Sequence, residues 1–451
     1  MFNKVLVANR GAVAARVLRA LHELRIKSVA IYSEADYGAP YLEMASETQA
    51  VGPAPAGESY LNQDRLIEVI KRSAVDGVHP GYGFLSENAG FAQRVIDAGA
   101  RFIGPSPRWI DAMGHKTRAR ELAAHYGMPL SQGSGVLPAA PEAILAAARA
   151  IGFPVLVKPA GGGGGIGMLP ARDEAELLSA VERSRSLASR GFGNAEVYLE
   201  RLIERPRHVE FQVLGDRHGA AAHLFERDCS TQRRNQKVIE EAPAPGIARA
   251  KLDGMAEKVA DMVRGMGYDN IGTVEMLYGA DGSFSFLEMN TRLQVEHGVT
   301  EAVTGIDLVQ AQIRSADGEP LAAILPEKPA LTGHAIEARV YAEDPKNFFP
   351  SPGRLKVFRL PEDPAIRIDT GYAEGRDVTP HYDPMIAKVI VRDTTRDRTI
   401  GRLVEALKAI DIQGIKHNIP AVISVLESGA FRAGEVHTGI IQQVMTQKKA
   451  A

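Results

Sequence analysis

The stretch Phe286-Leu287-Glu288-Met289-Asn290-Thr291-Arg292-Leu293-Gln294-Val295-Glu296-His297 decides the fold of this chain. Its polar residues occupy even positions and its apolar residues mostly odd ones, which is the period-two pattern of an extended strand. Carboxylates, an amide and a guanidinium are therefore expected on one face, roughly 6.5 Å apart along the strand. Such groups suit Mg²⁺ and phosphate oxygens. The alternative is an edge strand whose charged face is solvated.

The composition is that of an ordinary globular protein. The chain has 451 residues, 45% of them hydrophobic, and a formal net charge of −2. Its length predicts about two to four domains, and its balanced charge gives no reason to expect nucleic acid or an anionic membrane surface as a partner. A single cysteine, Cys229, excludes an internal disulfide framework and suits a reducing compartment. No apolar run reaches membrane-spanning length and no signal peptide precedes the first strand, so we expect a cytoplasmic protein.

The N-terminal part alternates strands and helices. A predicted strand, helix and strand cover residues 4–8, 11–24 and 28–32. This β-α-β unit predicts a parallel, doubly wound layer. Gly11 is either part of a phosphate-binding loop or a tight turn between strand and helix. The loop from His79 to Asn88 has glycines on both sides of Tyr82, which is either presented to a ligand or simply packed.

Five successive glycines, Gly161 to Gly165, follow a predicted strand that contains Lys158. Glycine loses more backbone entropy on ordering than any other residue, so this run predicts a mobile loop whose N–H groups can close over phosphates. Gly162, Gly164 and Gly167 match the dinucleotide fingerprint, but no helix begins at the loop, and the chain has no P-loop. A strand lysine before a glycine flap indicates a different ATP site, and a flexible linker is the alternative.

The segment from residue 197 onward is predicted to be rich in strands. A charged run, Glu226 to Glu241, lies between strands; such runs are usually solvated, but this one could place Lys237 in a cleft. Glu275 and Glu288 are expected opposite or diagonal on paired strands, where they would repel unless a divalent cation lies between them. This predicts a Mg²⁺ site. Lys116, at the start of a helix, is either solvated or part of a phosphate site.

At these motifs the chain resembles the biotin carboxylase family, a branch of the ATP-grasp enzymes. The motifs are Val7 to Gly11, His79 to Asn88, the glycine run, Glu226 to Glu241, Glu288 to His297 and Gly333 to Arg339. The resemblance implies an α/β and α+β multidomain fold with a Rossmann-like N-terminal domain over residues 1–113 and an ATP-grasp domain over 114–331. A glycine-rich lid would span about 131–203, and a C-terminal domain 332–446. From the pattern, residues 332–444 are strands followed by helices, and the tail 447–451 is frayed.

The resemblance also implies the roles of the site residues. ATP would be bound by Lys116, Lys158, Gly163, Gly164, Gly165, Glu200, Arg201, Ile203, His208, Gln232, Asn235, Glu275 and Glu288. Mg²⁺ or Mn²⁺ would be bound by Glu275, Glu288 and Asn290, bicarbonate by Lys237, Arg292, Gln294 and Val295, and biotin by Tyr82 and Arg339. The implied catalytic residues are Lys237, Arg292, Arg339, which stabilises the biotin enolate, and Glu296, the general base.

The implied reaction is the ATP- and bicarbonate-dependent carboxylation of biotin through carboxyphosphate, with release of ADP and phosphate. No Met-Lys-Met motif for biotin attachment occurs in the sequence, so the biotin is expected on a separate carrier protein. A carboxyltransferase subunit and a homodimer are also implied, as in a multi-subunit acyl-CoA carboxylase. The alternatives are a different acceptor, such as urea, and a catalytically silent subunit that binds nucleotide and only scaffolds or regulates a carboxylase.

The sequence departs from the family pattern at several positions. These are Asn235 and Ile166, where a histidine and a basic residue are usual, Gly298 and His115 for proline and aspartate, and Tyr41 and Ser46 for histidine and aspartate. The implied catalytic residues are unchanged. The departures leave open the nucleotide affinity, the closure of the lid and the identity of the acceptor.

Overall fold

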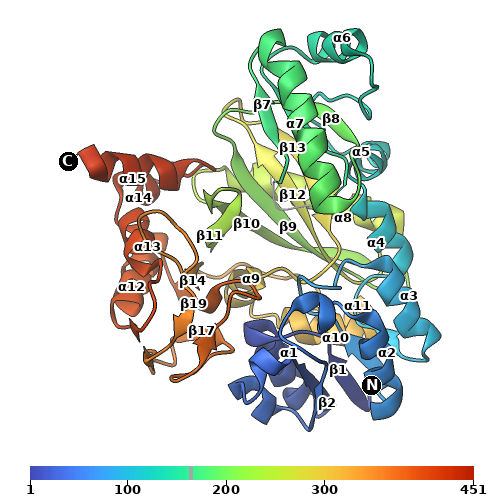
Figure 1. Ribbon diagram of the computed structural model, residues 1–451, viewed down its shortest axis with the longest axis vertical. Helices are drawn as coiled ribbons and strands as arrows, with labels where there is room; N and C mark the ends of the chain where they lie inside the picture. The colour runs from blue at the N-terminus through green and yellow to red at the C-terminus, as the bar shows by residue number, and fades with distance from the viewer. Residues whose placement is uncertain (162–165, 451) are drawn as a thin grey trace.

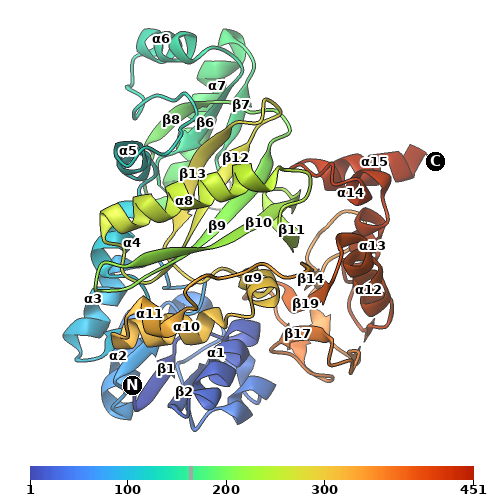
Figure 2. The ribbon, with the colours of Figure 1, turned by 180° about the vertical axis from the view of Figure 1, so that it is seen from behind.

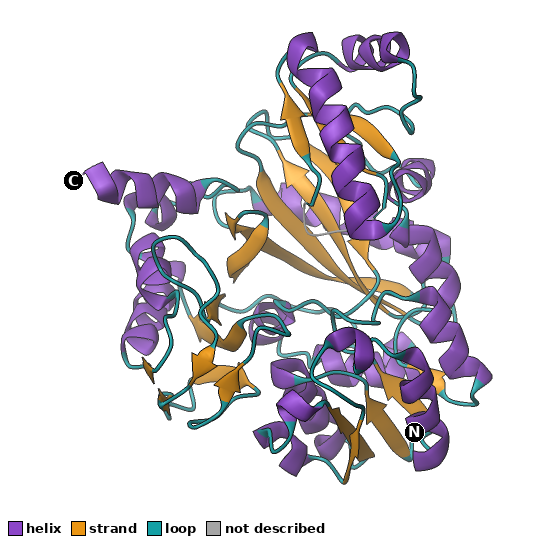
Figure 3. Cartoon of the chain, viewed as in Figure 1, coloured by secondary structure: helices purple, strands orange, loops and turns teal. Residues whose placement is uncertain are grey.

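A central eight-stranded sheet connects the parts of the molecule (Figure 1). The structure is a computed structural model, and it describes residues 1–161 and 166–450. One part with its own parallel sheet lies at the N-terminus, a second with a small three-stranded sheet lies at the opposite end, and the C-terminal helices lie to one side (Figure 3).

The N-terminal part is a parallel layer, as predicted. Its elements are β1 (Lys4–Val7), α1 (Gly11–Glu23), β2 (Lys27–Tyr32), η1 (Glu34–Asp36), η2 (Pro40–Met44), β3 (Glu47–Ala50), η3 (Ala56–Glu58), α2 (Gln63–Ser73), β4 (Gly77–His79), α3 (Ala89–Asp97), β5 (Arg101–Phe102) and α4 (Pro107–Gly114). The strand order β3-β2-β1-β4-β5 reverses between β1 and β4. In open parallel sheets this reversal leaves a crevice at the carboxyl ends of the two strands.

The small sheet lies at the end of the molecule opposite the N-terminal part (Figure 1). It has the order β7-β6-β8. Its elements are α5 (Lys116–His125), which precedes it, α6 (Pro141–Ile151), β6 (Val155–Pro159), β7 (Leu169–Ala171), α7 (Glu174–Phe192) and β8 (Val197–Arg201). Helices α6 and α7 pack on the sheet around a separate core that includes Ile144, Val157 and Leu177. This layer occupies the segment for which a lid is predicted.

The central sheet has the order β13-β12-β9-β10-β11-β14-β19-β17 and is antiparallel. Its first strands are β9 (Arg207–Gly215), β10 (Ala221–Arg233), β11 (Gln236–Ala242), β12 (Ile271–Tyr278) and β13 (Phe284–Asn290). Helix α8 (Arg249–Met266) lies across β9 and β10 (Figure 2). Helices α9 (His297–Thr304), α10 (Leu308–Asp317) and α11 (Leu321–Ile324) lead to the C-terminal part.

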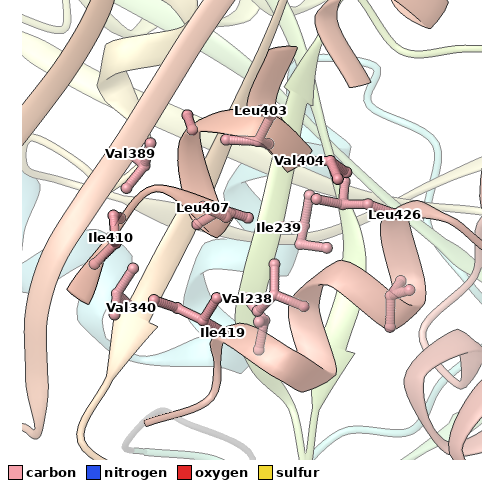
Figure 4. Close-up of a cluster of buried hydrophobic side chains, with 14 of the residues drawn as sticks. Val238, Ile239, Val340, Val389, Leu403, Val404, Leu407, Ile410, Ile419 and Leu426 are labelled. Carbon is pink, nitrogen blue, oxygen red and sulfur yellow. The ribbon is translucent and has the colours of Figure 1, made fainter. Parts of the chain in front are cut away.

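The C-terminal part completes the same sheet. Its elements are β14 (His334–Tyr341), β15 (Gly353–Arg354), β16 (Val357–Arg359), β17 (Ile366–Thr370), β18 (Asp377–Val378), β19 (Met385–Asp393), α12 (Arg396–Lys408), β20 (Asp411–Gln413), α13 (Ile419–Leu426), α14 (Gly429–Arg432) and α15 (Ile440–Ala450). Leu403 and Leu407 of α12 pack with Val389 and with Ile239 of β11 in one core (Figure 4). The C-terminal helices therefore cover strands from both halves of the sheet.

The predicted ends of two elements are wrong. The strand expected over Phe286–His297 ends at Asn290, and residues 291–296 form a loop before α9. This loop leaves the sheet because Gln294 and Glu296 turn inward to Lys237. The tail expected to fray from residue 447 instead continues α15 to Ala450.

Glycine geometry resolves one open alternative. Gly11 has φ +63°, in the left-handed region that favours glycine, so it forms the predicted tight turn between β1 and α1. A Cβ at Gly371 would lie 2.4 Å from the Gly11 Cα, which shows how closely the C-terminal part approaches this turn. Among the described residues, none of the helices is long and apolar enough to cross a membrane.

Candidate active site

A cleft of about 1200 Å³ lies between the small sheet and the central sheet. It is lined by the described residues that the sequence predicts for nucleotide, metal, bicarbonate and catalysis: Lys116, Lys158, Glu200, Arg201, Ile203, His208, Gln232, Asn235, Lys237, Glu275, Glu288, Asn290, Arg292, Gln294, Val295, Glu296 and Arg339. The predicted Gly163, Gly164 and Gly165 lie outside the described residues. The fold thus brings together side chains from segments far apart in the sequence.

Lys237 is the centre of the charged end of the cleft. Its Nζ donates to Glu210 (2.5 Å), Glu296 (2.6 Å), Glu275 (2.8 Å) and Gln294 (3.2 Å). Burial opposes the ammonium charge, but the three carboxylates outweigh it and raise the pKa of Lys237 well above its usual value. The ammonium therefore stays charged, and it neutralises only part of the surrounding negative charge.

The charged run that contains Lys237 is folded differently from the prediction. It does not lie between strands but forms most of β10 and β11, joined by a turn at Arg234 and Asn235, both with positive φ. Asparagine tolerates this conformation, and the turn twists the hairpin in the hand that paired strands prefer. Lys237 pairs with Gln232 across the hairpin, and both side chains reach the cleft as expected.

A row of charged residues crosses four strands beneath Lys237. Glu288 on β13 lies opposite Glu275 on β12, which confirms that these two carboxylates face each other across paired strands. Glu275 lies opposite Glu210 on β9, and Glu210 lies opposite Arg227 on β10. Burial alone would raise the pKa of Glu275, but Lys237 and His208 hold it well below the usual value. This carboxylate is therefore ionised.

The predicted metal ligands offer oxygen atoms suited to a hard cation. The carboxylate of Glu288 lines the cleft, and its nearest cation is Lys116 at 3.3 Å. The amide of Asn290 donates to Glu275 (2.8 Å) and its Oδ1 accepts from Arg292 (3.0 Å). Two carboxylates and an amide oxygen fit Mg²⁺ or Mn²⁺, which prefer oxygen ligands and commonly share a site with phosphates.

Glu296 occupies the junction between Lys237 and Arg339. One oxygen accepts from Lys237, and the other accepts from Arg339 Nη2 at 3.0 Å. Burial opposes its ionisation, but Lys237, Arg339 and Arg227 together lower its pKa far below the usual value. The loop that carries it is fixed because Lys388 donates to the carbonyl oxygen of Val295 at 2.5 Å. Glu296 is thus a positioned, ionised carboxylate.

The opposite end of the cleft combines fixed cations with apolar side chains. Glu200 accepts from Lys158 and from Arg120, both at 3.0 Å, and Lys116 begins α5 beside them. Two ammonium groups and a helix N-terminus favour a polyanion such as a triphosphate. Apolar side chains from the small sheet and from the central sheet that suit a flat base also line the cleft: Leu156, Met168, Leu202, Ile203, Leu277 and Leu287.

The sequence pattern predicts the wrong face of the strand for Leu287. The alternation places it away from Glu288, yet both side chains line the cleft. The register of β12 and β13 shifts between Glu275 and Met276, where Glu275 pairs with Glu288 but Met276 pairs with Phe286. This bulge adds Leu287 as an unpaired residue and breaks the strict alternation.

A second cavity of about 350 Å³ adjoins the cleft. It lies at the crevice where the strand order reverses, and it is lined by Arg10 and Gly11 after β1 and by Tyr82 after β4. Burial raises the pKa of the Tyr82 phenol well above its usual value, so this side chain is neutral. Arg292 and Arg339 line both spaces. A group bound in either one can therefore reach the same two guanidinium groups.

Sequence reasoning missed several residues that hold the site. Glu210 and Arg227 fix the charged row, Arg120 holds Glu200, Glu87 accepts from Arg292 Nε at 2.7 Å, and Lys388 fixes the Val295 carbonyl. Only Glu210 left a local signal, because residues two apart on a strand share a face and His208 was assigned. The others act on partners from distant segments.

Comparisons with known proteins agree with this arrangement. The family described as "Biotin carboxylase, N-terminal domain" matches residues 1–110, "Carbamoyl-phosphate synthase L chain, ATP binding domain" matches 115–324, and "Biotin carboxylase C-terminal domain" matches 337–443. The biotin carboxylase of Halalkalibacterium halodurans is 48% identical over 98% of this chain and 97% of its own.

Solved structures give the same result. The biotin carboxylase domain dimer of Hydrogenobacter thermophilus 2-oxoglutarate carboxylase, in complex with MgADP, ADP and bicarbonate, has a TM-score of 0.95, 40% identity and 99% coverage of both chains. The biotin carboxylase-β-γ-ATP complex from Campylobacter jejuni has a TM-score of 0.95 and 38% identity, with 98% of this chain and 99% of that one covered.

Proposed function

Because the chain belongs to the biotin carboxylase family, we propose that it carboxylates the biotin of a separate carrier protein, with ATP and bicarbonate as substrates and ADP and phosphate as products. The observation that carries this proposal is the position of Arg292 and Arg339 on the boundary of the two cavities. A reaction that joins a nucleotide-activated group to a second substrate needs groups that reach both binding sites. The charges that develop in this reaction are anionic, so guanidinium groups can stabilise them.

The large cleft binds ATP with its divalent cation. The cations of the small sheet, Lys116 and Lys158, hold the phosphates, while Glu275, Glu288 and Asn290 supply oxygen ligands to Mg²⁺ or Mn²⁺. When bound, the cation neutralises phosphate charge during transfer. The solved relative from Hydrogenobacter thermophilus holds MgADP and bicarbonate, which supports both ligands.

Glu296 is the base that deprotonates bicarbonate. A carboxylate between Lys237 and Arg339 is weakly basic in isolation, since both cations lower its pKa. The same cations, together with Arg292, would also lower the pKa of a bicarbonate bound among them. Whether the proton moves therefore depends on the difference between the pKa of Glu296 and that of bound bicarbonate. The same cations lower both pKa values. The deprotonated bicarbonate then attacks the γ-phosphate to give carboxyphosphate.

Proton transfer to Glu296 also prepares the second step. Arg339 Nη2 is shared between Glu296, at 3.0 Å, and Glu240, at 2.6 Å. Once Glu296 carries a proton it no longer attracts the guanidinium as an anion. Arg339 can then turn its charge toward the ureido oxygen of biotin in the smaller cavity, beside Tyr82. Carboxyphosphate decomposes to CO₂ and phosphate, the phosphate takes the ureido proton, and the ureido nitrogen then attacks CO₂ to form the N–C bond of carboxybiotin.

The domain organisation and the assembly are inferred from the family. We infer domains over residues 1–113, 114–331 and 332–446, a homodimer, and a carboxyltransferase partner for the acyl-CoA step, in line with family members that act within larger carboxylases. The lone Cys229, buried and reduced in the structure, suits the reducing cytoplasm.

The decisive experiment measures bicarbonate-dependent ADP release by the purified chain with free biotin and then with a carrier protein. Free biotin should be carboxylated slowly, because it lacks the effective concentration of a tethered carrier. The cognate carrier should raise the rate strongly, and acyl-CoA alone should give no carboxylated product. A folded, ATP-binding protein without turnover would support a silent subunit instead.

A further inference from the structure

Two buried carboxyl groups face each other behind Arg339. Glu240 on β11 and Glu337 on β14 are direct cross-strand partners, and both side chains have no exposed surface. Neither oxygen of Glu240 accepts a hydrogen bond, and neither does Oε1 of Glu337. Arg339 Nη2 lies 2.6 Å from Glu240 and Lys388 Nζ lies 3.3 Å from Glu337.

Such a pair is unfavourable when both groups are ionised. Like charges opposite each other on paired strands repel, and one cation beside each buried carboxylate offsets only part of its cost of desolvation. Two carboxyl groups in one buried site therefore tend to keep a proton between them. In agreement, burial raises the pKa of Glu240 to about 8 against the opposing effect of Arg339, and burial also raises the pKa of Glu337.

Charged and titratable groups surround the pair from every neighbouring element. They are Arg339 and Tyr341 on β14, Lys388 on β19, Asp369 on β17, Cys229 on β10, Tyr82 in the loop after β4, Glu296 in the loop before α9, and His297 on α9. His297 contributes no charge, because burial lowers its pKa to about 3. Asp369 is paired with Arg367 and does not compete for the proton.

The charge on Arg339 depends on this pair. If Glu240, Glu337 and Glu296 were all ionised, one guanidinium would face three carboxylates and would offer little positive potential to a developing enolate. A proton kept by the pair removes one of these charges. When Glu296 also takes a proton from bicarbonate, Glu240 is the remaining group that fixes the position of Arg339.

We propose that Glu240 and Glu337 share one proton at neutral pH and that Glu240 is a positioning residue, which holds Arg339 in place while leaving its charge available to biotin. This inference rests on the proposed function, since it is that function which gives Arg339 its contact with biotin. The proton itself belongs to the free protein and can be detected without any substrate.

Infrared difference spectroscopy on the whole chain tests for the shared proton. The parent should show the carbonyl stretch of a protonated, buried carboxyl group at pH 7, and this band should disappear at alkaline pH. Both Glu240→Gln and Glu337→Gln should remove it, because the remaining carboxyl ionises beside Arg339 or Lys388. Glu241→Gln is the matched control: this buried neighbour is hydrogen-bonded to His334 and Arg396, and its replacement should leave the band unchanged. Persistence of the band in both variants of the pair would overturn the proposal.

Kinetics test the positioning role. Glu240→Ala should lower kcat/KM for biotin by about 100-fold, as expected for a displaced catalytic group. Glu240→Gln, which keeps the size of the side chain, should recover most of this loss and should shift the alkaline limb of the pH profile. If Glu240→Ala does not fold, the positioning role is tested by the pH dependence of kcat/KM in Glu240→Gln. An active parent whose profile is unchanged in Glu240→Gln would overturn the inference, whereas an inactive parent would overturn the proposed function.

Discussion

Replacement of Lys237 by methionine should convert the charged end of the cleft from a stabilising network into a destabilising one. The side chain is only 13% exposed, and its ammonium contacts the carboxylates of Glu210, Glu275 and Glu296. Methionine fills a similar volume but leaves these carboxylates without their common partner. Breaking a buried charge network by removing one partner typically costs about 3–5 kcal/mol, and we expect a loss of this size in the free energy of unfolding at pH 8.

The sign of the pH dependence follows from proton binding. In the parent, Lys237 holds the pKa values of Glu275 and Glu296 below those of the unfolded chain, so their stabilisation is complete at neutral pH and is lost only as the pH falls below about 4.3. Without Lys237, burial raises the pKa of the same carboxyls. The folded variant then binds protons that the unfolded chain does not, and its stability falls as the pH rises from about 5 to 8.

Urea unfolding of parent and variant at pH 5.5 and pH 8 checks this expectation. Lys4→Met is the matched control, because Lys4 forms a partly exposed ion pair with Glu47 and its loss should cost less than about 1 kcal/mol at either pH. Zn²⁺ provides a second readout, since two sets of three ligand atoms around Lys237, each with all atoms within 4.8 Å of one another, lose the neighbouring ammonium in the variant. They comprise His208, Glu210 and Glu275, and Glu210, Cys229 and Glu296. Zn²⁺ should raise the free energy of unfolding of Lys237→Met but not that of the parent. An equal penalty at both pH values would refute the reasoning.

Three further changes test other parts of the molecule. Glu296→Gln should keep ATP binding, measured by calorimetry, but lower the carboxylation rate by roughly 10²–10⁴, as for loss of a general base; normal turnover would exclude that role. Ile166, whose side chain is 53% exposed, lacks the charge usual in the lid, so Ile166→Lys should tighten ATP binding by about fivefold at low salt, and less as salt increases. An affinity that does not change at low salt would mean that the side chain points away from the phosphates. Gly298→Ala should destabilise the fold, since its Cβ would lie 2.4 Å from Ile390 Cδ1, but should destabilise it much less in the Ile390→Val background, where that atom is absent and the remaining close contact is Glu337 Oε2 at 3.2 Å. Equal effects in both backgrounds, measured by urea unfolding, would show that Ile390 is not the obstacle.

The sequence predicted the strands of the site better than their ends. The alternation that begins at Phe286 correctly predicts β13, and the hairpin between Glu275 and Glu288 is confirmed by their register. Alternation continues past Asn290, but hydrogen bonds from Gln294 and Glu296 to Lys237 draw the chain out of the sheet. A local pattern contains no information about a partner some 60 residues away, so the end of the strand could not be predicted.

The same limit applies to the residues that support the site. Lys388 is a lysine in the predicted C-terminal part, and its contact with the Val295 carbonyl depends on β14 and β19 joining the sheet of the ATP cleft. Arg120 appears as one of two arginines on α5 until Glu200 is placed beside it. Glu240 appears as an acid in a charged run, and only the pairing of β11 with β14 shows that it is buried opposite Glu337.

The position of Glu296 explains why the two cavities belong to one reaction. Its two oxygens connect Lys237, in the nucleotide cleft, with Arg339, on the wall of the smaller cavity. While Glu296 is ionised it binds both cations and neutralises part of the positive charge that Arg339 offers to a ligand of the smaller cavity. In the proposed mechanism, a proton taken from bicarbonate weakens both contacts at once, so the full charge of Arg339 would become available to biotin only after bicarbonate has been activated. On this proposal, the protonation of one carboxyl group sets the order of the two steps.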